Sequence, residues 1–253
     1  MEMRGVDGNN LIFHTPQKVK EIKARLDEAG VSLSALGSPL GKIDIDAPFE
    51  KHFEEFKQAV EIAHTMNTSN IRMFSFYIPE GKIQEKKEKV LERMGCFVEY
   101  AKINDIVLLH ENEKGIYGEK ANECKELMKI FGGAHFKAIF DFANFVQAEQ
   151  DTWEAYELLK DDIAYIHVKD AIATNGNVVP AGMGDGNVAA ILKDLYLNGF
   201  NGFLSLEPHL FHFSGFESLE RGSEVLKGEN KVLSGFEAFS LAHESLVSIL
   251  NKL

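Results

Sequence analysis

Four strand-like segments in the second half of this 253-residue chain each end on a side chain that metal ions prefer. The segments are VLLHENE (107–113), AIFDFANF (138–145), AYIHVKD (164–170) and FLSLEPH (203–209). The side chains that close them are Glu111, Asp141, His167 and Glu207. Three carboxylates and an imidazole suit a divalent ion with open coordination positions, such as Mn²⁺, Zn²⁺, Co²⁺ or Mg²⁺. Parallel strands of a barrel bring their carboxyl ends to one face, where active sites are built, so the pattern predicts a metal site there.

Each of the four residues, taken alone, also has a simpler interpretation. Glu111 or Asp141 could be a charged residue that keeps a loop edge soluble, and His167 could be a buried histidine of the core. Glu207 follows FLSL and precedes a proline, at a strand end where charges are rarely buried without a partner. The occurrence of all four at successive strand ends favours the ligand interpretation.

The elements that must position these residues alternate between strands and helices along the whole chain. Strands are predicted over 1–6, 31–37, 71–77, 105–111, 136–142, 163–169 and 203–208. Between them, apolar residues recur with helical spacing, for example from Thr15-Pro16 to Gly30, over 49–63, over 90–101 and over 234–250. Such alternation requires parallel strands with helical crossovers. We therefore predict an α/β fold, a TIM-type (β/α) barrel, formed as a single domain by residues 1–253.

The strand count is seven, whereas a closed TIM barrel has eight. The first strand begins at Met1, so the first β-α unit of a barrel is absent from this chain. Either an internal methionine was taken as the start, or the barrel is open or seven-stranded, or a second polypeptide fills the gap. We favour the first explanation because an unpaired parallel edge buried among helices is costly.

Composition narrows the class of protein. Apolar residues make up 45% and charged residues 26% of the chain, as in ordinary globular proteins, and no apolar run is long enough to span a membrane. The net charge of −12 argues against nucleic acid as a partner. The amino terminus lacks the regions of a signal peptide, and Cys96 and Cys124 are predicted to be reduced core thiols, so a cytoplasmic protein is expected. Barrels of this kind often form dimers or tetramers, so a homo-oligomer is left open.

The residues at the strand ends also carry a resemblance to a known family. ENE, the Asp141-to-Asn144 pair, HVKD and SLEPH occur in the order typical of the sugar phosphate isomerase/epimerase superfamily. That superfamily has the xylose-isomerase-like barrel and includes ketose 3-epimerases, inosose dehydratases and abasic-site endonucleases. The resemblance runs from about residue 2 to the carboxyl terminus and is most specific from HVKD to SLEPH. It implies that one divalent cation, usually Mn²⁺, is held by Glu111, Asp141, His167 and Glu207.

The resemblance further implies a reaction. In the epimerases, the two metal-bound glutamates form an acid/base pair on opposite faces of the carbon that is inverted, here Glu111 and Glu207. They would exchange a C–H proton next to a carbonyl while the metal holds the substrate oxygens. A metal-dependent isomerase or epimerase acting on a sugar, sugar phosphate or polyol is thus expected. The alternatives are an inosose-type dehydratase on the same scaffold, or a non-catalytic carbohydrate-binding barrel if the absent unit is real.

Four further residues are candidates for substrate binding. Asn144 stands where the epimerases and nucleases often have histidine, and Lys169 shares the strand face of His167 but could be an ordinary surface lysine. Arg72 could bind a substrate carboxylate or phosphate, or pair with a neighbouring carboxylate. His209 could line the pocket or orient Glu207. HVKD is not followed by the Asp-x-His partner of the nucleases, which argues against their three-zinc chemistry.

Overall fold

A curved sheet of seven parallel strands forms the centre of the protein, whose computed structural model describes residues 1–210 and 234–253. In spatial order the strands are β1 (Glu2–Met3), β4 (Ala35–Gly37), β5 (Asn70–Met73), β6 (Val107–Glu111), β7 (Phe136–Asp141), β8 (Ile163–Val168) and β11 (Phe203–Leu206). Each strand pairs in parallel with its neighbour. Within the described residues no pairing joins β1 to β11, so the sheet is a nearly closed barrel. The predicted TIM-type α/β architecture is confirmed.

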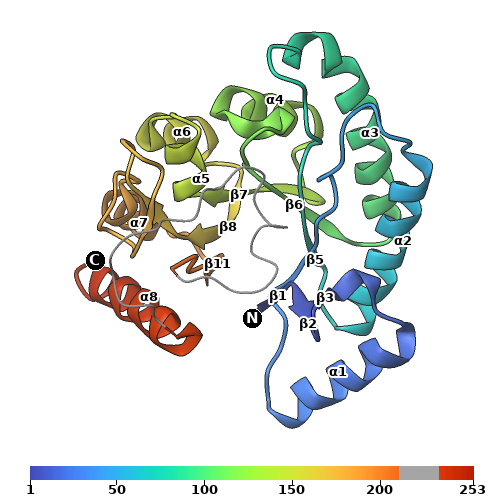
Figure 1. Ribbon diagram of the computed structural model, residues 1–253, viewed down its shortest axis with the longest axis horizontal. Coiled ribbons are helices and arrows are strands. Elements are labelled where there is room, and N and C mark those ends of the chain that lie inside the picture. Colours follow the sequence, from blue (N-terminus) through green and yellow to red (C-terminus); the bar gives the residue numbers. More distant parts are fainter. Residues whose placement is uncertain (211–233) are drawn as a thin grey trace.

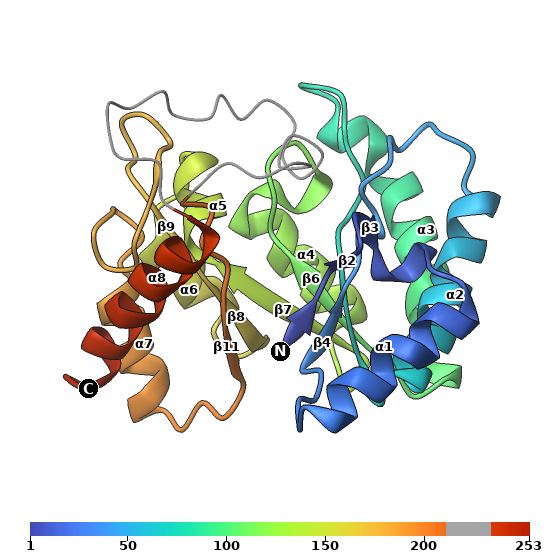
Figure 2. The ribbon, with the colours of Figure 1, turned by 60° about the horizontal axis from the view of Figure 1, so that its bottom comes forward.

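Helices lie on the outside of this sheet, as Figures 1 and 2 show. They are α1 (Pro16–Glu28), α2 (Glu50–Thr65), α3 (Ile83–Ile103), α4 (Ala121–Phe131), α5 (Phe142–Gln147), α6 (Thr152–Leu159), α7 (Val188–Leu197) and α8 (Gly235–Leu250). Short elements complete the described chain: the hairpins β2 (Gly5–Val6) with β3 (Asn9–Asn10) and β9 (Asp170–Ala171) with β10 (Val178–Val179), and the 3-10 turns η1 (Leu11–Phe13) and η2 (Tyr117–Glu119).

The helix ends follow from local chemistry that the sequence displays. Thr15 caps α1, because its Oγ1 accepts the backbone N–H of Lys18 at 3.3 Å, and Pro16 occupies the first turn, where its missing N–H costs nothing. Gly30 ends this segment with a φ of +67°, a conformation that favours glycine. At the other end of the chain, Ser234 and Glu237 form a reciprocal capping box on α8. The predicted boundaries of the first helix, α1, and of the last helix, α8, are therefore confirmed.

An aromatic cluster fixes α2 and α3 against the sheet. Phe56 of α2 and Phe97 of α3 lie with ring centroids 4.9 Å apart at an interplanar angle of 80°, and Phe97 stacks on Phe76, which follows β5. All three side chains are fully buried. Burial of each ring stabilises the fold by about 1.5–3 kcal/mol, and edge-to-face contacts add somewhat more. This packing holds α2 and α3 in place against the segment that follows β5.

One prediction about the core is wrong. Cys124 of α4 is buried, but Cys96 of α3 is exposed. The buried face of α3 carries Met94 and Phe97. Cys96 is two residues after Met94 and one before Phe97, so its side chain points away from that face. No helix in the described ranges is long and apolar enough to cross a membrane.

Candidate metal centre

The four predicted ligands converge at the carboxyl ends of β6, β7, β8 and β11. One donor atom from each of Glu111, Asp141, His167 and Glu207 can be chosen so that all four lie within 4.8 Å of one another. A single ion with bonds of about 2.1 Å brings opposite donors to roughly 4.2 Å, so small side-chain movements suffice to surround one ion. We call these four residues the ligand cluster. The convergence that the sequence pattern predicts is present.

Strand register explains the convergence. Asp141 at the end of β7 is the direct partner of His167 on β8, and Glu111 on β6 is the partner of Ile139, two residues earlier on β7. Glu207 lies one residue beyond β11, whose Ser205 pairs with His167. Because side chains alternate between the faces of a strand, these positions point into the barrel at one level. Glu113, two residues after Glu111, lies beyond the strand end and pairs with Lys42 at 2.7 Å.

His167 is at the centre of the site and is only 1% exposed. Its Nδ1 lies 2.9 Å from Glu111 Oε1, 3.5 Å from Glu207 Oε2 and 3.9 Å from Asp141 Oδ2. Its Nε2 lies 2.8 Å from Oε2 of Glu2. Burial opposes the charged form, but Glu111, Glu2 and Glu207 together raise the pKa of His167 well above its ordinary value.

Two carboxylate oxygens of the cluster are buried without a hydrogen bond. Within the described structure, Glu111 Oε2 and Asp141 Oδ2 accept none. Their nearest ion-pair contacts are Arg72 Nη1 at 3.3 Å from the first and Lys169 Nζ at 3.2 Å from the second. A buried acceptor without a partner is costly, and a coordinated cation would satisfy both oxygens. These residues therefore fit a divalent ion.

The charges of the buried groups support the same conclusion. Arg72 and Lys169 are the buried cations in contact with the site. Four carboxylates surround them: Glu2, Glu111, Asp141 and Glu207. If all four are ionised and His167 is neutral, as a metal-binding imidazole is, the negative charges exceed these two positive charges by two, which is the charge that a divalent cation brings. Buried charge without compensation is strongly unfavourable.

The carboxylates of the cluster differ in their tendency to ionise. Burial raises the pKa of Glu111, but His167 and Arg72 outweigh it and lower the value to about 2. Burial likewise opposes the ionisation of Glu207, yet Lys169, His209 and His167 lower its pKa well below the ordinary range. For Asp141, burial dominates over Lys169 and, with the neighbouring glutamates, raises the pKa to about 7. The two glutamates are thus carboxylates at neutral pH.

The candidate substrate-binding cations are both engaged with the cluster. Arg72 is 6% exposed, and its Nη1 lies 3.5 Å from Glu2, 3.3 Å from Glu111 and 3.6 Å from Glu207, so it pairs with neighbouring carboxylates. Lys169 is 4% exposed, so the surface-lysine interpretation is wrong. Its Nζ donates to Asn144 Oδ1 at 3.0 Å and to Glu207 Oε2 at 3.3 Å.

Asn144 and His209 also lie beside the cluster. The Asn144 side-chain amide donates to the carbonyl of Asn112 at 2.9 Å and to Glu111 Oε1 at 3.4 Å. The backbone N–H of Asn144 donates to Asp141 Oδ1 at 2.8 Å, so Asp141 caps α5. His209 Nε2 lies 3.6 Å from Glu207 Oε1, a position from which it can orient that carboxylate. All four candidates are thus in or next to the site.

Three residues at the site were missed by sequence reasoning. Glu2 contacts His167 from β1, and no motif marks it. Asn112 donates to the carbonyl of Asp141 at 3.1 Å and accepts its N–H at 3.0 Å, which locks the ends of β6 and β7 together. Asp170 accepts four backbone N–H groups from the loop that follows β8. The HVKD and ENE motifs contain Asp170 and Asn112, but their partners are not readable from the sequence.

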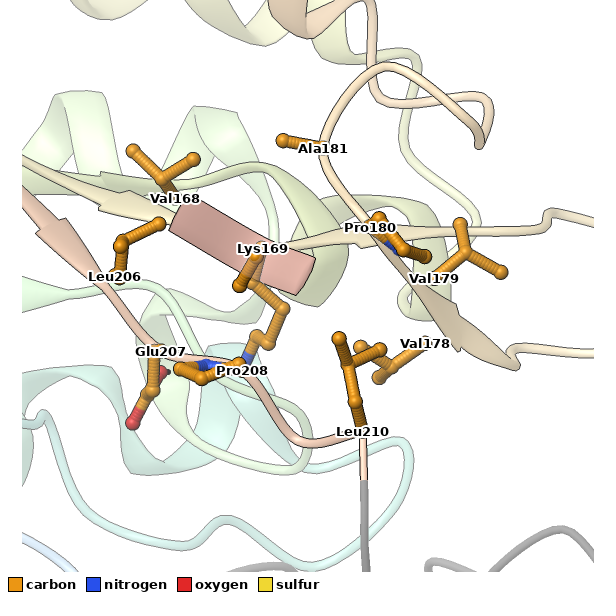
Figure 3. Close-up of a pocket in the computed structure, with 11 residues that line it drawn as sticks. Val168, Lys169, Val178, Val179, Pro180, Ala181, Leu206, Glu207, Pro208 and Leu210 are labelled. Atoms are coloured by element: carbon orange, nitrogen blue, oxygen red, sulfur yellow. Dashed lines mark hydrogen bonds and ion pairs between the residues drawn. The ribbon is translucent and has the colours of Figure 1, made fainter. Parts of the chain in front are cut away.

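A small, mostly apolar pocket lies beside Lys169 and Glu207. Figure 3 shows the Lys169 side chain extending from the end of β8 toward Pro208, while Val178 and Pro180 approach from the β10 segment. The segment 178–181 therefore forms one wall next to the ligand cluster. Apolar groups there shield the charged side chains from water.

Comparison with known proteins agrees with this geometry. The family described as xylose isomerase-like TIM barrel matches residues 1–228. Among curated proteins, the uncharacterized protein YihM of Escherichia coli (strain K12) is 23% identical over 155 residues, which cover 60% of this chain and 45% of YihM. The chain thus spans less than half of the length of this relative.

Solved structures share the fold at low sequence identity. A D-tagatose 3-epimerase-like protein superposes with a TM-score of 0.71 at 19% identity, over 94% of this chain and 84% of its own. The IOLI protein with a bound zinc atom gives 0.69 at 16% identity, over 99% and 87%. The probable 3-DHS dehydratase AsbF of Bacillus anthracis gives 0.61 at 19% identity, over 76% of each chain. At these identities the likeness establishes the fold.

Proposed function

The chain belongs to the xylose isomerase-like TIM barrel family, and we propose that it is a metal-dependent isomerase or epimerase acting on a sugar or sugar phosphate. The reaction would proceed by proton transfer at a carbon next to a carbonyl. The observation that carries the proposal is the meeting of Glu111, Asp141, His167 and Glu207 within 4.8 Å, with two carboxylate oxygens that accept no hydrogen bond. Epimerase and isomerase names among the structural relatives support the reaction class.

The four residues of the ligand cluster would hold the cation, which we expect to be Mn²⁺, with Zn²⁺, Co²⁺ or Mg²⁺ as alternatives. When bound, a divalent ion supplies electrostatic stabilisation to an oxygen that gains negative charge next to the reacting carbon. Glu111 and Glu207 come from β6 and from the residue after β11, and both are ionised at neutral pH. One of them, as a carboxylate, would remove the proton from one face of the carbon, and the other, after taking a proton from the solvent, would donate that proton to the opposite face.

Neighbouring side chains would bind and orient the substrate. Lys169 lies within 3.3 Å of both Asp141 and Glu207, so its ammonium can donate to a substrate hydroxyl or carbonyl there. Asn144 can accept or donate to a hydroxyl, and His209 would hold Glu207 in place. Arg72 would balance the charge of the glutamates and could also contact an anionic substrate. Orientation of the substrate accounts for a large part of the rate in such reactions.

Solvent hydrogen exchange tests the proposal. The purified protein is incubated with Mn²⁺ in D₂O with a panel of ketoses, ketose phosphates and inososes, and the products are analysed by NMR. We expect deuterium at one carbon next to the carbonyl, together with a new epimer or isomer. Glu207→Gln should still bind the metal but lose exchange, whereas Glu126→Gln, which changes a glutamate bonded to Lys87 and Tyr117, serves as the control.

The same experiment distinguishes the other classes. A dehydrated product would identify a lyase of the dehydratase type, and saturable binding without exchange would identify a carbohydrate-binding protein. Metal analysis of the protein as purified identifies the native cation. Failure of every sugar to exchange in a protein that holds its metal would overturn the proposed reaction.

A further inference from the structure

Glu2, which is not part of the ligand cluster, contacts the imidazole of His167, which is. Glu2 begins β1, and its side chain is 8% exposed. Its Oε2 lies 2.8 Å from His167 Nε2, and its Oε1 lies 3.5 Å from Arg72 Nη1. Glu2 is therefore held between a candidate ligand and the arginine that pairs with the two glutamates of the cluster.

This contact decides which ring nitrogen faces the cation. A carboxylate only accepts hydrogen bonds, so the Glu2 contact keeps a proton on Nε2, and a bound metal would replace the proton that Nδ1 donates to Glu111. The other nitrogen, Nδ1, faces the remaining ligands, at 2.9 to 3.9 Å from Glu111, Glu207 and Asp141. Metal-binding histidines commonly donate their second ring N–H to a carboxylate, which fixes the tautomer and the orientation of the ring.

We propose that Glu2 is a positioning residue that holds His167 with Nδ1 toward the metal and thereby raises the affinity of the site for a divalent cation. This inference rests on the proposed metal centre. It assigns a role to β1 that its place at the edge of the sheet does not suggest, because within the part of the chain that the structure describes β1 pairs with β4 alone, through Glu2 and Met3.

The same contact couples metal binding to the order of β1. His167 is on β8, so the Glu2 bond joins strands that are not neighbours in the sheet. If Glu2 strengthens metal binding, a bound metal must strengthen the attachment of Glu2 to the same extent, since coupling between two sites is reciprocal. Hydrogen exchange at the backbone N–H groups of residues 2–6 should therefore slow when the metal is added.

Zinc binding by variants of Glu2 tests the inference without any substrate. Zn²⁺ is the probe, its affinity is measured by competition with a chromophoric chelator, and ¹⁵N-histidine NMR identifies the nitrogen of His167 that is ligated, with His167→Ala for assignment. The wild type should show ligated Nδ1 and protonated Nε2. Glu2→Leu should weaken binding by about 100-fold and Glu2→Gln, whose amide oxygen still accepts the N–H, by about tenfold, the two ends of the range for such partners.

Glu126→Gln is the matched control, since Glu126 also accepts from two donors, Lys87 and Tyr117, neither of which belongs to the ligand cluster, and it should bind Zn²⁺ as the wild type does. Wild-type affinity and unchanged imidazole signals in both Glu2 variants would overturn the role of Glu2 and leave the metal centre intact. If Glu2→Leu does not fold, wild-type affinity and signals in Glu2→Gln overturn the role by themselves. Equal Zn²⁺ binding by His167→Ala and wild type would overturn the metal centre and the inference together.

Discussion

The ligand cluster and the loop that follows β8 lie next to each other, and each contains a fully buried aspartate. The two aspartates differ in the number of hydrogen bonds that their oxygens accept. Asp170 follows β8, and its oxygens accept the N–H groups of Ala171, Gly182, Gly184 and Gly186, each at 2.9 Å. In the ligand cluster, Asp141 Oδ1 accepts one N–H at 2.8 Å, and Oδ2 accepts no hydrogen bond within the described residues.

The difference separates a carboxylate that holds a loop from a candidate metal ligand. Each oxygen of Asp170 accepts two of these N–H groups, and the bonds hold the loop of residues 172–187, which we call the glycine loop. Asp141 has one oxygen that is in ion-pair contact with Lys169 but accepts no hydrogen bond within the described residues, at a point where three other donor groups meet. Burial is the same for both residues, so the number of bonds to each oxygen, and not burial, indicates which carboxylate can bind an ion.

The largest expected effect is the loss of stability in Asp170→Ala. This change removes the acceptor of four backbone N–H groups, that of Ala171 and those of three glycines of the glycine loop, and each unpaired buried group costs about 1–3 kcal/mol before the loop rearranges. We expect the free energy of unfolding to fall by about 4 kcal/mol, measured by urea denaturation. A fall of less than about 1 kcal/mol would show that Asp170 does not hold the loop.

Asp141→Asn should behave in the opposite way. The amide keeps an oxygen that can cap α5, and the change removes a carboxylate that Glu111 and Glu207 disfavour. We expect the unfolding free energy of metal-free protein to change by less than about 1 kcal/mol, while affinity for Zn²⁺ falls by more than about 100-fold, beyond the range for an outer partner. Unfolding in EDTA and zinc titration measure the two quantities. Destabilisation as large as that of Asp170→Ala would remove the contrast between the aspartates.

A smaller effect is expected when a methyl group is added inside the glycine loop. A Cβ at Gly184 would lie 2.4 Å from the carbonyl oxygen of Ala171 and 2.5 Å from Asp170 Oδ1, so Gly184→Ala must push the loop away. We expect a loss of about 2 kcal/mol in urea denaturation. Gly95→Ala is the matched control, because Gly95 is within α3 and its nearest neighbour, Phe131, is 3.8 Å from the added Cβ. That change should stabilise the protein by about 0.5–1 kcal/mol.

The smallest effect concerns a buried histidine outside both regions. His52 Nε2 accepts the N–H of Gly41 at 2.8 Å, and burial lowers the pKa of His52, an effect that Arg93 reinforces and Glu55 opposes. The unfolded chain then binds more protons than the folded one just below the ordinary histidine pKa of about 6.5, so stability should fall as pH decreases through that range. Urea denaturation at several pH values should show a shallower decline for His52→Gln than for wild type. Equal pH dependence of the two proteins would contradict this account.

Much of the fold could be predicted from the sequence because its signals are local. The helix that begins at Thr15-Pro16 and the strand that ends at Glu111 are marked by residues within a few positions of their ends. Strand lengths were predicted too long, for example 71–77 where β5 is Asn70–Met73, because apolar residues beyond the strand end, such as Phe74 and Phe76, are buried by other contacts.

The sequence by itself predicted the seven strands, four of the helices around them and the four residues of the ligand cluster. Those features follow from the period of apolar residues and from the type of residue at each strand end, which neighbouring positions specify. The tertiary structure alone decided the contact of Glu2 with His167, 165 positions away, and the different roles of Asp141 and Asp170. Such contacts depend on strand register and loop closure across the whole barrel, and a local pattern carries no record of them.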